Sequence, residues 1–371
     1  MAARVTELLN GSAVALALGV ASRTGLLRAL SQEPSTVENI AKVSKLHPRY
    51  VEEILAVLVC GKVAILTEEQ PAKYSLSAET SSALDGMGLY FEELPLLTRC
   101  AFDEVVSAAS TGGGVPPGCY GSFGAWMGKL ADEKHEKQLI SKLLPLLGGG
   151  SMVSKLDAGG AEVLDVGCGE GTAACLIAER FPKVQVHGLD AFEPSIQGAQ
   201  RRANERQLRN VHFLRGDASA FARPELMNRF DLVTSFDVIH DLTRPDATLQ
   251  EIRKVLKADG IFVMVDIRAE TGVAKNLGHP MAPFLYTVSL MHCMPQGMND
   301  GGPGLGMMWG RQKALSMLQE AGFEVEVVEM EFDTFNDCYV RSGEARRSKV
   351  FDPGKDAPVL EMAMPGLLPV C

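Results

Sequence analysis

The sequence lacks paired cysteines, an excess of positive charge and long apolar runs. Its eight cysteines are scattered without a CxxC spacing, so a structural zinc site or a disulfide framework has little support. Lys and Arg number 36 against 46 Asp and Glu, for a net charge of −10, which argues against binding to nucleic acid or an anionic membrane. The apolar run from Ala13 to Ala21 is too short to span a membrane, and Glu7 lies where a signal peptide carries basic residues. We therefore expect a cytoplasmic protein.

The N-terminal residues 1–84 predict a winged-helix module. Residues 5–30 are rich in Ala and Leu and indicate one or two apolar helices broken near Gly25. A capping-box pattern at Ser35 to Glu38 opens a short helix, Pro48 begins another that reaches Cys60, and two short strands follow. This order of elements is typical of a winged helix.

A winged helix also suggests DNA recognition through its second main helix. That helix carries Glu52 and Glu53 beside Arg49 on its polar face, and two carboxylates repel phosphate. We therefore favour a dimerisation and shielding domain, with a homodimer formed through the helices of residues 5–30.

Residues 85–157 predict a helical connector with a glycine- and proline-rich loop at 111–120. Aromatic side chains follow the loop directly, among them Tyr120 and Trp126. Aromatics beside such a loop suggest the rim of a pocket, whereas the same spacing also fits an amphipathic helix that packs into the core.

Residues 163–172, which read Val-Leu-Asp-Val-Gly-Cys-Gly-Glu-Gly-Thr, combine a strand, a glycine turn and a helix start. Gly167, Gly169 and Gly171 let the backbone turn tightly beside a ligand. Dinucleotide sites also begin this way, but they space the glycines as GxGxxG, whereas this turn is GxGxG and follows Asp165. The spacing favours S-adenosylmethionine over NAD.

Strand and helix patterns alternate from residue 162 onward, which is typical of an α/β fold with a Rossmann-like, doubly wound parallel sheet. The strand candidates are 163–166, 184–189, 211–214, 230–235 and 261–266. Ligands bind such sheets beyond the carboxyl ends of the strands. These ends carry Asp165, Asp190, Asp217 and residues 236–240, so they predict one shared ligand site.

These ordered motifs resemble those of class I S-adenosylmethionine-dependent methyltransferases over about residues 160–341. The resemblance implies the seven-stranded sheet of that family and S-adenosyl-L-methionine as cofactor. It implies that the glycine loop lies against the methionine part, Asp190 at the ribose, Asp217 with Ala218 at the adenine, and Phe236 beside the adenosine or the sulfonium. With the N-terminal module included, the chain is similar to the winged-helix-fused methyltransferases of small molecules.

His240 and Asp241 are similar to the His-Asp pair of winged-helix O-methyltransferases, in which the histidine removes a proton from the acceptor hydroxyl. Histidine suits that task because its reference pKa of about 6.5 leaves it largely neutral. Those enzymes usually have a tryptophan after the pair, where this chain has Leu242. A structural histidine that closes the loop stays open as the alternative, and we expect Asp241 to point away from His240.

A long insertion at 268–310, rich in Gly, Pro and Met, follows the fifth strand and predicts a lid, with a helix at 285–294. The connector and the lid together offer the predicted acceptor-binding residues Tyr120, Trp126, Met291, His292 and Trp309. That the methionines of this segment form a patch of the core, and not a pocket wall, is an equally open interpretation. His292 is the second candidate base.

No metal ion is expected, because the acids after the fourth strand, Asp237 and Asp241, lack an evident third carboxylate. A helix at 311–322, a strand at 323–328 and an antiparallel strand at 335–341 complete the predicted domain 158–341. Residues 342–371 predict a tail. We thus expect a methyltransferase that acts on a hydroxyl of a small molecule. The alternatives are N-, S- or C-methylation by proximity, an NAD-dependent dehydrogenase, and a DNA-binding regulator that senses S-adenosylmethionine.

Overall fold

The computed structural model describes residues 1–30, 33–67 and 70–341, and the chain divides into two compact units after Leu96. The predicted tail, residues 342–371, lies outside the described residues. Helix α6 (Tyr90–Thr111) crosses the division between the units.

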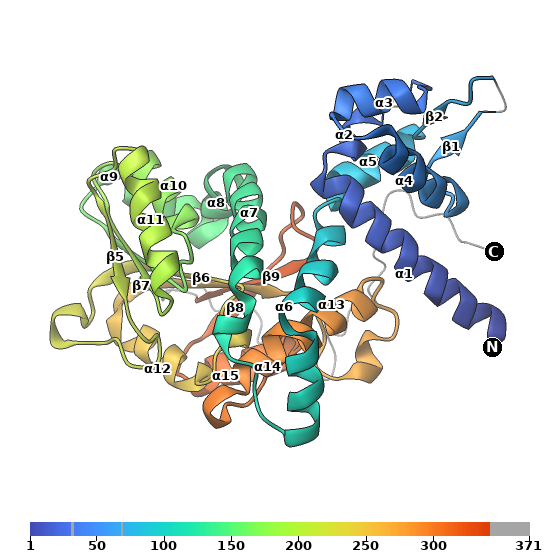
Figure 1. Ribbon diagram of the computed structural model, residues 1–371. Coiled ribbons are helices and arrows are strands. Elements are labelled where there is room, and N and C mark those ends of the chain that lie inside the picture. Colours follow the sequence, from blue (N-terminus) through green and yellow to red (C-terminus); the bar gives the residue numbers. More distant parts are fainter. Residues whose placement is uncertain (31–32, 68–69, 342–371) are drawn as a thin grey trace. The chain divides into compact units, whose positions relative to one another are not determined.

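The first unit has the order of a winged helix (Figure 1). Its elements are α1 (Ala2–Arg23), α2 (Leu26–Ala29), α3 (Val37–Ser44), α4 (Pro48–Cys60), β1 (Ile65–Leu66), β2 (Tyr74–Ser75) and α5 (Ala78–Met87). Strands β1 and β2 pair antiparallel as the wing. Gly25, with φ +76°, separates α1 from α2 where the break was predicted. The cap of α3 is Thr36, which accepts from Asn39 N, and not Ser35, because the helix starts one residue later than the capping-box pattern suggests.

The polar face of α4 carries no unpaired cation for phosphate. Arg49 forms ion pairs with Glu52, at 3.5 Å, and with Glu53. Because Arg49 is already paired with two carboxylates, the polar face of α4 offers no free positive charge to a DNA phosphate.

Helix α1 is longer than the apolar run suggested. It spans 22 residues, with a mean hydropathy of 1.4 over its most apolar window, and 17% of that window is buried. By length and composition alone it is able to cross a membrane, so the expectation that this segment is too short is wrong. A core helix of a soluble protein or a signal sequence has the same properties, and the helix is weak evidence for a membrane span.

The second unit is built on a seven-stranded sheet with the order β5-β4-β3-β6-β7-β9-β8. The strands are β3 (Glu162–Val166), β4 (Gln185–Asp190), β5 (Val211–Arg215), β6 (Phe230–Phe236), β7 (Leu256–Ile267), β8 (Val325–Val328) and β9 (Asn336–Arg341). The first five pair in parallel, and β9 lies antiparallel between β7 and β8, as predicted for the last strand. The chain order reverses between β3 and β6, where a crevice for a ligand opens in such sheets.

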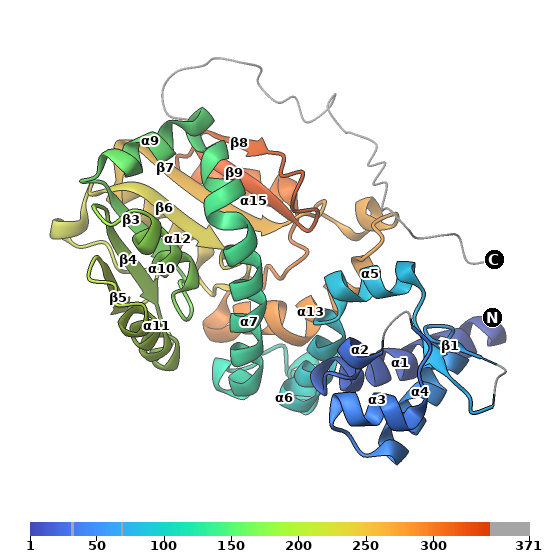
Figure 2. The same ribbon diagram turned by 90° about the horizontal axis from the view of Figure 1, so that it is seen from above.

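Helices cover both faces of this sheet (Figure 2). They include α7 (Gly121–Gln138), α8 (Leu144–Leu146), α9 (Ser151–Ala158), α10 (Thr172–Arg180), α11 (Glu193–Glu205), α12 (Pro245–Val255) and α15 (Arg311–Glu320). Alternate strand residues face opposite cores: Val163 packs with α10 side chains such as Ile177, whereas Leu164 packs with α12 and α15 side chains such as Ile252. Successive side chains of each strand are therefore buried on opposite faces of the sheet, so both faces are covered by helices.

The lid insertion is helical but irregular. It contains α13 (Ala282–Val288), the π-helical turn η7 (Ser289–Cys293) and α14 (Met294–Gly297). The helix predicted at 285–294 is therefore interrupted, because the π turn places one extra residue in the helical cycle. Such turns occur frequently at functional sites.

Candidate active site

The glycine loop between β3 and α10 adopts backbone angles that favour glycine. Gly167, Gly169 and Gly171 have φ values of +71°, +53° and +75°. A Cβ atom on Gly167 would lie 2.4 Å from Val238, and one on Gly171 would lie 2.6 Å from Phe213. A Cβ on Gly169 would meet nothing within 4 Å. Two of the glycines therefore permit close packing, and the third leaves open space in which a ligand reaches the backbone.

Asp190, the last residue of β4, holds this loop in place. Its Oδ2 accepts a hydrogen bond from Gly169 N at 2.9 Å, and its Oδ1 accepts one from Phe192 N at 2.8 Å. Burial raises the pKa of Asp190, and the two backbone donors partly oppose that rise. Each oxygen keeps a further lone pair, so the geometry leaves room for the ribose hydroxyls, and the role of Asp190 there stays a prediction.

Asp165 lies buried in β3 beneath the loop. Its Oδ1 accepts a hydrogen bond from Thr234 Oγ1 at 2.8 Å. Burial raises its pKa to about 7, and the negative charge of Asp190 adds to the rise. Asp165 is therefore a carboxyl group that changes charge near neutral pH.

The remaining predicted cofactor residues lie at the ends of β5 and β6. Asp217 accepts from Ser219 N at 2.8 Å and pairs with Arg244 at 2.8 Å, and Ala218 packs against the core that contains Leu164. Phe236 ends β6. The carboxyl ends of four neighbouring parallel strands thus present the glycine loop, Asp190, Asp217 and Phe236 along one edge of the sheet.

These residues fit the cofactor that the resemblance implied. The open backbone at Gly169 admits a ligand. Asp190 ends β4 and Asp217 follows the end of the adjacent strand β5, and both offer hydrogen-bond acceptors. S-adenosylmethionine carries hydroxyl, amino and ammonium donors that match such acceptors.

His240 lies beyond the end of β6 in the short 3-10 turn of Ile239–Asp241 and is almost completely buried. Its Nδ1 donates to Asp266 Oδ1 at 2.7 Å, and its Nε2 lies 3.2 Å from Asp241 Oδ1. Burial opposes the charged imidazolium, but Asp266 and Asp241 outweigh it and hold the pKa of His240 well above its ordinary value. Trp309 Nε1 donates to the same oxygen of Asp266 at 3.1 Å.

The expectation that Asp241 points away from His240 is wrong. The tight 3-10 turn brings the two neighbouring side chains to the same side of the backbone. His292 and Cys293, from the π turn of the lid, lie beside them: His292 Nδ1 is 3.8 Å from Asp241 Oδ2 and 3.5 Å from Cys293 Sγ. Burial lowers the pKa of His292.

The predicted acceptor-binding aromatics are packed together and buried. Tyr120 and Phe123 each contact the His292 ring edge-on, with centroids 4.7 Å and 4.8 Å away, and Phe123 stacks on Trp126. The Tyr120 hydroxyl donates to Met291 O at 2.9 Å. Tyr120, Trp126, Met291 and His292 thus lie in one packed cluster beside the His240 turn. Trp309 packs instead in the core that contains Leu164 and reaches the turn through Asp266.

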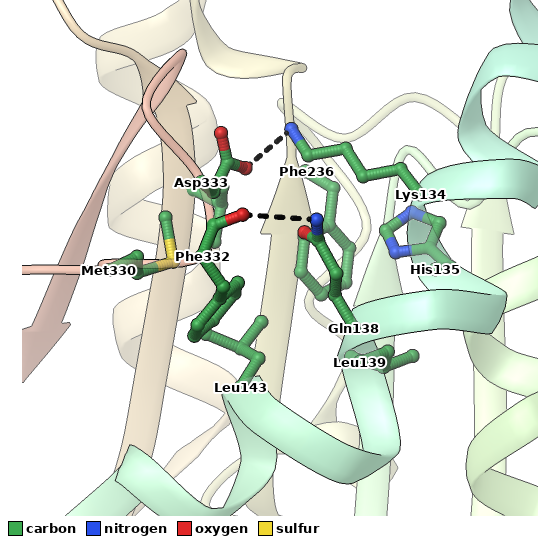
Figure 3. Close-up of a pocket in the computed structure, with 10 residues that line it drawn as sticks. Lys134, His135, Gln138, Leu139, Leu143, Phe236, Met330, Phe332 and Asp333 are labelled. Carbon is green, nitrogen blue, oxygen red and sulfur yellow. Dashed lines mark hydrogen bonds and ion pairs between the residues drawn. The ribbon is translucent and has the colours of Figure 1, made fainter. Parts of the chain in front are cut away.

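A small pocket opens over Phe236 (Figure 3). Its empty volume is about 260 Å³, and it lies between α7 and the segment that leads into β9. His135 contacts the Phe236 ring edge-on at 4.7 Å, and burial lowers the pKa of His135 to about 4. Lys134 pairs with Asp333 at 3.0 Å across the pocket mouth. This pocket flanks the proposed cofactor residue Phe236.

Sequence reasoning missed Lys134, His135, Asp266 and Cys293. Asp266 lies at the carboxyl end of the strand predicted at 261–266, and this position could have marked it as a site residue. Lys134 and Cys293 belong to helices whose orientation against the sheet is set by tertiary packing.

Two family models match the chain, one within each unit. Residues 157–322 match the "Methyltransferase domain" family, and residues 12–85 match the "Rv2258c-like winged HTH domain". The chain carries a methyltransferase domain. The predicted family is therefore confirmed, and so are the fold class and the expected cofactor, S-adenosylmethionine.

Curated relatives align over about a third of the chain. A fatty-acid O-methyltransferase from Mycolicibacterium smegmatis is 33% identical over 118 residues, which are 32% of this chain and 41% of that protein. A malonyl-[acyl-carrier protein] O-methyltransferase from Paenibacillus is 28% identical over 30% of this chain and 40% of that protein. The chain thus spans about two fifths of the length of these relatives.

Solved structures share the fold over nearly the whole chain. A putative O-methyltransferase from Nostoc punctiforme has a TM-score of 0.67 at 18% identity, covering 92% of this chain and 98% of that one. Human N-acetylserotonin methyltransferase, solved in complex with S-adenosylmethionine, has a TM-score of 0.62 at 17% identity and covers the same shares.

The affinity for S-adenosylmethionine is expected to depend on pH through Asp165. The raised pKa means that Asp165 takes up a proton as the pH falls through about 7, and the cationic ammonium and sulfonium groups are attracted to the ionised form. The dissociation constant should therefore rise by up to about tenfold per pH unit below that pKa. Calorimetric titrations between about pH 6 and pH 8 measure the effect, and Asp165→Asn should abolish the pH dependence. A wild-type affinity that does not change with pH would contradict this role.

Proposed function

We propose that the protein transfers the methyl group of S-adenosylmethionine to a hydroxyl oxygen of a small-molecule acceptor. The observation that supports it most is the position of His240. It lies on the loop of β6, the strand next to the glycine-loop strand β3, with its Nδ1 anchored on Asp266. An electrophile held by β3 and β4 and a proton acceptor held by β6 thus lie along the same strand ends.

When bound, the cofactor supplies an electrophilic methyl group, and the protein supplies orientation and exclusion of water. The glycine loop and Asp190 would hold the methionine and ribose parts, and Phe236 and Asp217 would lie along the adenosine. The buried cluster of Tyr120, Phe123 and His292 keeps water from the acceptor side. Methyl transfer is then an in-line displacement at close range.

His240 is the proposed base. Nδ1–H of His240 donates to Asp266, so Nε2 is the nitrogen that accepts the hydroxyl proton in the neutral form. Asp266 and Asp241 hold the pKa of His240 well above its ordinary value, so the neutral fraction, and with it the proposed base activity, grows as the pH rises. Asp266 also accepts from Ile267 N at 2.8 Å and from Trp309, and these bonds fix the carboxylate and the ring. His292 is the second candidate, with its pKa lowered by burial.

An oxygen acceptor is favoured over nitrogen, sulfur or carbon because two of the curated relatives are named O-methyltransferases. The fold neighbours include further proteins of that name. The net charge and scattered cysteines support the cytoplasm as the proposed location.

Calorimetric titration with S-adenosylmethionine and, separately, with NADH tests the cofactor half of this proposal. We expect S-adenosylmethionine to bind and NADH to give no heat. Binding of NADH without binding of S-adenosylmethionine would overturn the proposed reaction.

We also propose a homodimer in which α1 packs against its copy. Leu9 is 69% exposed and Leu16 is 56% exposed on this helix, whereas Leu18 and Ala21 belong to the unit's own core. The double variant Leu9→Glu/Leu16→Glu should convert a dimer into a monomer in light scattering after size exclusion, because charge in an apolar interface is costly. Val43→Glu on α3 is the matched control, since Val43 is 69% exposed as well. A wild-type protein that elutes as a monomer would contradict the proposed homodimer.

A further inference from the structure

One carboxylate of the connector reaches the glycine loop from outside the methyltransferase match. Asp132 lies on α7, whereas the match to the methyltransferase family begins at residue 157. Its Oδ1 accepts a hydrogen bond from the hydroxyl of Thr172, the first residue of α10, and its Oδ2 accepts one from Arg202 Nη2 at 3.0 Å. We infer that Asp132 is a positioning residue, which holds the glycine loop in the shape that binds the amino-acid end of S-adenosylmethionine.

Arg202 carries the contact from Asp132 to the loop itself. It lies on α11, and its Nε donates to the backbone oxygen of Glu170 at 3.1 Å. The side chain of Arg202 is 19% exposed and that of Asp132 is 28% exposed, so solvent and salt screen this ion pair less than one on the surface. A guanidinium is planar, and a carboxylate bound to one of its nitrogens therefore fixes the direction in which the others donate.

The open segment of the loop is thus held from both sides. Asp190, on β4, accepts from Gly169 N at 2.9 Å, and Arg202 donates to Glu170 O. An added Cβ on Gly169 would meet nothing within 4 Å, so a ligand reaches the backbone between these two contacts. The methyltransferase domain supplies Asp190 and Arg202, but the carboxylate that orients Arg202 comes from the connector.

Helix α7 touches the loop at a second point. A Cβ added to Gly128 would lie 3.8 Å from Glu170 Cδ, and one added to Gly198 of α11 would lie 3.0 Å from Glu170 Cγ. The side chain of Glu170 therefore lies between two helices that both carry a glycine there. Gly128 is one helical turn before Asp132 and shares its face of α7. The same face of the connector helix thus contacts the side chain of Glu170 and orients the group that binds its backbone.

Loss of the Asp132 carboxylate should release Arg202 and loosen the backbone at Glu170. This inference rests on the proposed placement of the methionine part of the cofactor along the glycine loop. The affinity for that part should fall, whereas the contacts at the adenosine, such as Asp217, stay in place. A ligand that lacks the amino-acid end should therefore bind equally well with and without Asp132.

The test is calorimetric titration of the full-length protein with S-adenosylhomocysteine and, separately, with methylthioadenosine. Both ligands carry the adenosine and a thioether, and only the first has the amino-acid end. Asp132→Asn should weaken the binding of S-adenosylhomocysteine about tenfold and leave that of methylthioadenosine within about twofold. Arg202→Lys, which keeps a positive charge for Asp132 but loses the Nε donor, should show the same selective loss.

Glu136→Gln is the matched control. Glu136 lies one helical turn beyond Asp132 on α7 and pairs at 3.4 Å with Arg206, which follows α11. The variant removes a neighbouring ion pair between the same two helices, and it should leave both affinities unchanged. The double variant Asp132→Asn/Arg202→Lys should weaken binding little more than either single change, because both act on the same backbone oxygen.

The outcomes separate this inference from the placement of the cofactor. A wild-type protein that binds both thioethers equally contradicts that placement, and the inference with it. A wild-type protein that prefers S-adenosylhomocysteine, with the same preference in Asp132→Asn and Arg202→Lys, overturns the role of Asp132 alone. Equal weakening of both ligands in Asp132→Asn, with a lowered thermal midpoint, would show a purely structural contact and would overturn that role as well.

Discussion

Asp190→Ala is expected to weaken the binding of S-adenosylmethionine by about 30-fold or more. Loss of two charge-assisted hydrogen bonds to the ribose costs roughly 2–4 kcal/mol. The side chain also holds the glycine loop through Gly169 N and the following turn through Phe192 N. Isothermal titration of the purified variant measures the change.

The variant Asp190→Asn tests whether both carboxylate oxygens, and not only the shape of the side chain, are needed for binding. Both oxygens of Asp190 accept from backbone N–H groups, so an amide must turn its NH₂ toward one of these donors. We expect Asn to weaken binding nearly as much as Ala, although its shape is the same. Asp157→Asn is the control, because Asp157 is half-exposed and pairs with Arg180 on the surface. Near-normal affinity in both Asp190 variants would remove this residue from the cofactor site.

His240→Gln is expected to lower turnover of a hydroxyl acceptor by roughly 10² or more, while cofactor affinity stays unchanged. Glutamine keeps a donor for Asp266 and so limits the cost of leaving a buried carboxylate unpaired. Single-turnover rates and S-adenosylmethionine titrations on the same preparation separate chemistry from binding. For a phenolic acceptor, a more alkaline pH should recover part of the rate, because the acceptor then ionises without a base.

His292→Gln is the comparison that decides between the two candidate bases. If His240 is the base, His292→Gln should change turnover much less, since His292 contacts the aromatic cluster and the lid. A large loss in His292→Gln together with near-normal turnover in His240→Gln would move the base role to His292.

The sheet was predictable because its signals are local. Apolar runs such as Val163 to Val166, closed by glycines or an aspartate, mark strands whose carboxyl ends must meet in a parallel sheet. The break at Gly25 and the wing after α4 follow from glycine, proline and capping patterns in the same way. These features depend on neighbours within about ten residues.

The acceptor side was less predictable because it is assembled from distant segments. Asp241 and Cys293 are 52 positions apart, and their approach depends on a π turn that periodicity does not reveal. Tyr120 and His292 were both named, but their burial in one aromatic cluster follows from how α7 and the lid pack.

The measurement that tests the central proposal most directly is transfer of an isotope-labelled methyl group from S-adenosylmethionine to acceptors in a metabolite extract, read by mass spectrometry and NMR. We expect a labelled small molecule whose new methyl group is bound to oxygen, formed by the wild-type protein and not, at the same cofactor concentration, by Asp190→Ala. A protein that binds S-adenosylmethionine but labels no small molecule, or that labels only nitrogen, sulfur or carbon, would contradict the proposal.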